Sequence, residues 1–139
     1  MSLACVVGLL MARALGFAAG AFAFWVAHVL ERAHWIDWFH GEYDPWFLNS
    51  GRAILVTIGA VAVASAVVAA LAAAPRTATG LTVAAGAFAS MTLVLFLKPA
   101  GPGSIFPIVM VVGGVLLLAV SLAGAWTGVR LRHLFRAHD

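Results

Sequence analysis

Four long apolar runs, almost free of charge, limit the folds open to this chain. They extend over residues 3–30, 53–74, 78–97 and 105–129, and the only charged residue within them is Arg13. The hydrocarbon core of a bilayer is roughly 30 Å thick, so about 20 apolar residues in an α-helix cross it. Backbone polar groups in lipid must be satisfied within their own segment, which each run achieves as a helix. The sequence therefore predicts an all-α polytopic membrane protein, a four-helix transmembrane bundle.

The overall composition supports lipid as the solvent of this chain. Of its 139 residues, 64% are hydrophobic and only 9% are charged, whereas a soluble domain carries about 25% charged residues. Its mean hydropathy is +1.07. The formal net charge of +3 reflects a few arginines that flank the spans, so it does not indicate nucleic-acid binding. The excess of arginine over lysine, with abundant alanine and valine, favours a GC-rich bacterial genome.

The connections between the runs indicate a single transmembrane domain, residues 1–139. We interpret the first run as a retained span, because no basic residue precedes it and it is too long for a signal peptide. A loop of residues 31–52 should continue the first helix and then turn between Gly41 and Pro45. Residues 130–139 form a basic C-terminal tail. The single cysteine, Cys5, excludes an intramolecular disulfide.

Basic residues near the ends of the spans predict the orientation. One side carries the N-terminus together with Arg76, Arg130, Arg132 and Arg136. The other side carries Arg32, Arg52 and Lys98, together with four of the five acidic residues. We therefore expect both termini in the cytoplasm, the loop 31–52 outside, and a location in a bacterial inner membrane.

The loop begins with an unusual concentration of histidine and acidic residues, in which polar groups recur at every third position: His28, Glu31, His34, Asp37 and His40. Residues three or four apart share a helix face, so His28, Glu31, His34 and His40 are candidate ligands for a divalent transition metal. A spacing of three drifts by about 60° per step around an α-helix, so one helix presents only two or three of these groups. A second helix or subunit would complete the site. The alternative is a solvated, amphipathic helix end.

Tryptophans gather near the same predicted boundary, as expected for an aromatic belt at the membrane interface. Trp35, Trp38 and Trp46 are also candidates for contact with a lipid or another ligand. Arg13 has two interpretations. In the first, residues 14–30 cross the bilayer, and Arg13 at the cytoplasmic end of this span extends its side chain to the lipid phosphates. In the second, Arg13 lies within the membrane and serves a function there.

Small residues recur four positions apart in the first and last runs. Gly16 and Gly20 form one GxxxG pair, and Gly124 and Gly128 form another. Such pairs let helix backbones approach closely, so these four residues predict tight helix packing, within the chain or against partner helices.

These features lead to three functional hypotheses. The first is a small non-catalytic membrane subunit, a homo-oligomer or part of a larger membrane complex, that presents the His28–Trp46 segment outside. The second is a metal-binding or redox-linked membrane protein that uses Glu31, His34 and His40. The third is an uncoupled channel or transporter, formed as a homo-oligomer, with Arg13 lining its pathway. The predicted second, third and fourth spans lack ionisable residues, which disfavours an ion-coupled transporter.

Overall fold

The computed structural model describes residues 2–38, 51–72, 74–97 and 106–137. Each apolar run forms one helix: α1 (Leu3–Trp38), α2 (Gly51–Leu71), α3 (Arg76–Leu97) and α4 (Phe106–Arg136). Each is long and apolar enough to cross a membrane, and the described ranges contain no strand. The predicted all-α four-helix bundle is therefore confirmed.

The first and last helices are longer than the predicted spans. α1 continues past residue 30 to Trp38, and α4 continues past residue 129 to Arg136. Polar residues mark where a helix leaves the lipid, but the helix itself can continue through them. Proline does end a helix, and α2 stops shortly before Pro75. The Pro75 carbonyl then accepts hydrogen bonds from the Thr79 amide (3.0 Å) and the Thr79 hydroxyl (3.2 Å) at the start of α3.

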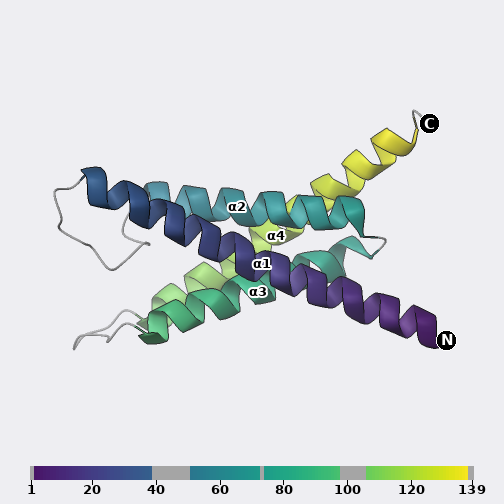
Figure 1. Cartoon of the computed structure of the whole chain (residues 1–139), viewed down its shortest axis with the longest axis horizontal. Helices are drawn as coiled ribbons and strands as arrows, with labels where there is room; N and C mark the ends of the chain where they lie inside the picture. Colours follow the sequence, from purple (N-terminus) through teal and green to yellow (C-terminus); the bar gives the residue numbers. More distant parts are fainter. Residues whose placement is uncertain (1, 39–50, 73, 98–105, 138–139) are drawn as a thin grey trace.

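The four helices form a ring in which α1 lies beside α3, α3 beside α4, α4 beside α2, and α2 beside α1. The most extensive contacts are those between α2 and α4 and between α1 and α3. Because successive spans alternate in direction, both of these pairs are parallel, and both termini lie at the same end of the bundle (Figure 1). We call this end the terminal end.

Glycines bring α2 and α4 into backbone contact. Gly124 and Gly128 of α4 are buried, and a Cβ atom added to them would collide with the carbonyl oxygens of Ala62 and Ala66 in α2. Gly124 therefore lies level with Ala62, and Gly128 with Ala66. This is the close approach that small residues four apart allow.

The α1–α3 contact has the same character. A Cβ atom on Gly20 of α1 would collide with the Val83 carbonyl, and one on Gly86 of α3 with the Phe17 carbonyl. Gly16 lies directly against the Thr82 hydroxyl. Both GxxxG pairs identified in the sequence thus pack against helices of the same chain.

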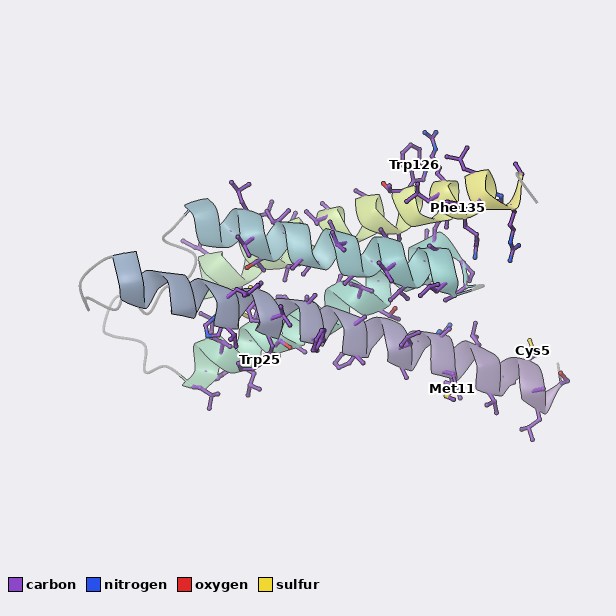
Figure 2. All side chains as sticks on the ribbon, turned by 45° about the horizontal axis from the view of Figure 1, so that its top comes forward. Cys5, Met11, Trp25, Trp126 and Phe135 are labelled. Atoms are coloured by element: carbon purple, nitrogen blue, oxygen red, sulfur yellow. The ribbon has the colours of Figure 1, made fainter. Side chains whose placement is uncertain are left out.

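Large apolar side chains point in two directions. Phe24, Val61, Val83, Met91 and Leu117 fill the interior. Many others project outward from every helix, among them Phe22, Leu55, Val63, Phe96, Val111 and Val115 (Figure 2). A water-soluble monomer rarely exposes so continuous an apolar surface. Together with the four membrane-spanning lengths, this surface indicates an integral membrane protein.

One buried hydrogen bond joins α2 to α4. The Ser65 hydroxyl donates to the Ser121 carbonyl oxygen at 2.6 Å, and both residues are fully buried. The Ser121 hydroxyl has no hydrogen-bond partner among the described residues. Only the Ser65 hydroxyl therefore adds a hydrogen bond to the α2–α4 interface among the described residues.

Replacing either close-contact glycine by alanine is expected to destabilise the bundle. Gly20→Ala and Gly128→Ala should each cost about 1–3 kcal/mol, because the added methyl group meets backbone that has little room to move. The matched control is Gly59→Ala in α2, where a Cβ atom would meet nothing within 4 Å. It should be neutral or stabilising by up to about 1 kcal/mol. Unfolding in mixed micelles, followed by circular dichroism, measures the difference. Equal stabilities for all three variants would contradict the described packing.

The two serines allow a second comparison. Ser65→Ala removes the interhelical donor and should cost roughly 0.6 kcal/mol and at most about 1.7 kcal/mol, the range of such bonds within membranes. Ser121→Ala keeps the accepting carbonyl, so its cost should be smaller. The same unfolding measurement decides, and a larger loss for Ser121→Ala would show that its hydroxyl makes the more important bond.

Candidate functional site

Most of the predicted metal ligands and contact tryptophans belong to the C-terminal part of α1. The helix carries Glu31, His34, Trp35 and Trp38 along its last two turns, but their side chains lie outside the described part of the structure, as do residues His40 and Trp46. Among the side chains that the structure describes, no group of three His, Cys, Asp or Glu residues gathers as a metal site would require. The proposed metal cluster is therefore untested and stays a prediction.

His28 is the one candidate ligand whose surroundings are described. It is buried, and its ring lies nearly parallel to that of Phe24, with centroids 6.4 Å apart and an interplanar angle of 9°. The Trp25 ring meets it edge-on, at 5.8 Å and 85°. His28 thus packs in an aromatic cluster on the inner face of α1, with the rings of Phe24 and Trp25 one turn earlier on the same helix.

The described charges belong to the terminal end of the bundle, and the side chains of Arg32, Arg52 and Lys98 lie outside the described part of the structure. The charged side chains that the structure describes are those of Arg13, Arg76, Arg130, Arg132 and Arg136. No carboxylate is among these side chains. A cationic surface of this kind attracts anions, and its field is strongest where the arginines share one level along the bundle.

The helix register places Arg13 of α1 and Arg76 of α3 near the level of Trp126 in α4. Gly16 of α1 contacts Thr82 of α3, so Arg13, three residues earlier in a parallel helix, lies near the first turn of α3. Gly80 of α3 lies against Leu122 of α4. Because these two helices are antiparallel, Arg76 lies near the level of Trp126. Arg13 is exposed, so in this chain it lies outside the bundle at its terminal end, away from the packed interior.

Two arginines of α4 make specific contacts. The Arg130 guanidinium carbon lies 3.7 Å from the centroid of the Trp126 ring, a cation–π geometry. Arg132 Nη1 donates a hydrogen bond of 2.7 Å to the Ala72 carbonyl oxygen just beyond α2. The last carbonyls of a helix lack intrahelical partners, and a cation there also opposes the negative end of the helix dipole. Arg132 therefore caps α2 and ties it to α4.

Sequence reasoning treated residues 130–139 as a basic tail and missed both contacts. The spacing of four between Trp126 and Arg130 is a usable signal, since residues four apart meet on a helix. The Arg132 contact has no comparable local signal, because its partner is 60 residues away in the chain.

The described cavities are apolar. A surface groove of about 310 Å³ between α3 and α4 is lined by Phe88, Met110, Val111, Gly114, Val115 and Leu118. A smaller space of about 30 Å³, about the volume of one water molecule in the liquid, lies among the helices beside Phe24, Thr57 and Met91. Neither offers charged groups to a ligand.

α1 extends beyond its neighbours at both ends. At the terminal end it passes α2 and α3, and at the opposite end it reaches further than the other three helices (Figure 1). Cys5 and Met11 lie on the projecting N-terminal part (Figure 2), where Leu3 is 81% and Met11 69% exposed. This part is apolar and has large uncovered side chains.

Comparison with protein-family models, curated proteins and solved structures found no match to this chain.

Removing the arginine that caps α2 is expected to destabilise the bundle. Arg132→Met should cost about 1–2 kcal/mol, because it leaves the Ala72 carbonyl without its charged donor. Arg136→Met removes the same charge one turn later, where the side chain is exposed, and should change stability by less than about 0.5 kcal/mol. Unfolding in nonionic detergent measures both, and equal effects would argue against the cap.

Proposed function

We propose that this chain is a small, non-catalytic subunit of a membrane complex. In this role the four-helix bundle holds α1 in the membrane, and α1 provides both the contact with a partner and the outward display of the His28–Trp46 segment. The observation that carries the proposal is the length of α1, which has 36 residues and so measures about 54 Å. A bilayer core requires only roughly 30 Å.

The partner surface is expected on the projecting part of α1, because the close-contact glycines are already occupied. Gly16, Gly20, Gly124 and Gly128 face α2 or α3 of the same chain. By contrast, Leu3, Val7, Leu10 and Met11 on α1 are exposed. Residues 3–12 of α1 form an apolar stretch of helix that extends past the first turn of α3. This stretch favours a partner helix that covers it.

The charge distribution supports one orientation for this subunit. Four basic residues, Arg76, Arg130, Arg132 and Arg136, flank the spans on the side of the termini, against three, Arg32, Arg52 and Lys98, on the other side, and basic residues favour the cytoplasmic side. In this proposal both termini are cytoplasmic, and the histidine- and tryptophan-rich end of α1 lies on the extracytoplasmic side of a bacterial inner membrane.

The lone cysteine gives a direct test, because Cys5 is free and exposed on the projecting part of α1. A maleimide–benzophenone reagent attached to Cys5 in native membranes, then activated by light, should join the chain to its partner. We expect one discrete adduct, whose mass on a gel and peptides in mass spectrometry distinguish a second copy from another protein.

The matched control moves the reagent to a lipid-facing site of the bundle. In a Cys5→Ser/Val63→Cys double variant the thiol lies on α2, where the wild-type Val63 is 64% exposed. This variant should give no discrete adduct. Absence of an adduct from Cys5, or an adduct from position 63 alone, would overturn the proposed role of α1.

A further inference from the structure

We propose that the Trp126–Arg136 segment of α4 is a binding surface for anionic phospholipid headgroups. The inference concerns the chain alone and does not depend on whether a partner binds to α1. It follows from where α4 leaves the bundle, how its side chains divide between two faces, and which charges surround them.

The segment emerges from the bundle as a helix. Gly128 of α4 lies against the Ala66 backbone of α2, and Arg132, one turn later, caps α2. Beyond this point Leu134 is 61% and Phe135 71% exposed. Figure 2 shows Trp126 and Phe135 on this part of α4, close to the C-terminus.

The side chains of the segment divide into an apolar and a basic face. At 100° per residue, Leu131, Leu134 and Phe135 fall within an arc of about 100°. Arg130, His133 and Arg136 fall on the remaining side, with Arg132 toward α2. A helix with apolar and basic faces that are both exposed suits the boundary between lipid chains and headgroups.

The charges described at this surface are positive. Arg130 and Arg136 are both exposed, and Arg76 lies near the level of Trp126. Arginine binds phosphate oxygens in a bidentate manner, and the contact with Trp126 holds the Arg130 guanidinium at the interface. A free phosphate would not cover Leu134 and Phe135. A phospholipid satisfies both the basic and the apolar face.

Lipid titration of the full chain tests the proposal. In nonionic micelles, native mass spectrometry should show that phosphatidylglycerol binds more tightly than phosphatidylcholine. Each surface arginine contributes about 1 kcal/mol, so each contributes about fivefold in affinity. The Arg130→Gln/Arg136→Gln variant, which keeps the Arg132 cap, should therefore bind phosphatidylglycerol about 25-fold more weakly.

Two controls make the outcome decisive. Arg52→Gln removes a positive charge from the other end of α2 and should change the affinity for phosphatidylglycerol less than twofold. Leu134→Ser/Phe135→Ser keeps every charge and should still weaken lipid binding. Equal affinity for both lipids, an equal loss in Arg52→Gln, or displacement of the lipid by millimolar inorganic phosphate would overturn the proposal. Circular dichroism confirms that each variant is folded before its affinity is compared.

Discussion

The contact of glycine with a neighbouring backbone holds this structure together. In lipid, helices gain nothing from removing apolar surface from water, so they associate through close packing and polar contacts. Here Gly20 meets the Val83 carbonyl in one parallel pair, and Gly128 meets the Ala66 carbonyl in the other. The two pairs then join along α1–α2 and α3–α4. The buried Ser65–Ser121 bond and the Arg132 cap add polar contacts to the α2–α4 pair.

This use of small residues has a consequence for the outer surface. Once the glycines face inward, large side chains such as Phe22 and Val63 face lipid, and the described space beside Phe24 and Met91 has room for little more than one water molecule. The features on which the two proposals rest are at the ends, where α1 extends beyond its neighbours and α4 carries its arginines.

Each end combines polar and aromatic side chains. At the terminal end, Arg130 packs on Trp126. The opposite end carries the histidine- and tryptophan-rich part of α1, of which the structure describes the buried His28 ring against Phe24 and Trp25. The metal hypothesis, with His28, Glu31, His34 and His40 as ligands, stays a prediction.

The sequence by itself determined that the chain crosses a membrane as four helices, because apolar length and the need to satisfy backbone hydrogen bonds act on each segment separately. It also indicated that Gly16, Gly20, Gly124 and Gly128 pack closely. Only the tertiary structure decided that their neighbours belong to the same chain, because a GxxxG pattern does not specify which helix approaches it. The tertiary structure also decided the Arg132–Ala72 bond and the common level of Arg13, Arg76 and Trp126, which depend on contacts between helices far apart in the chain.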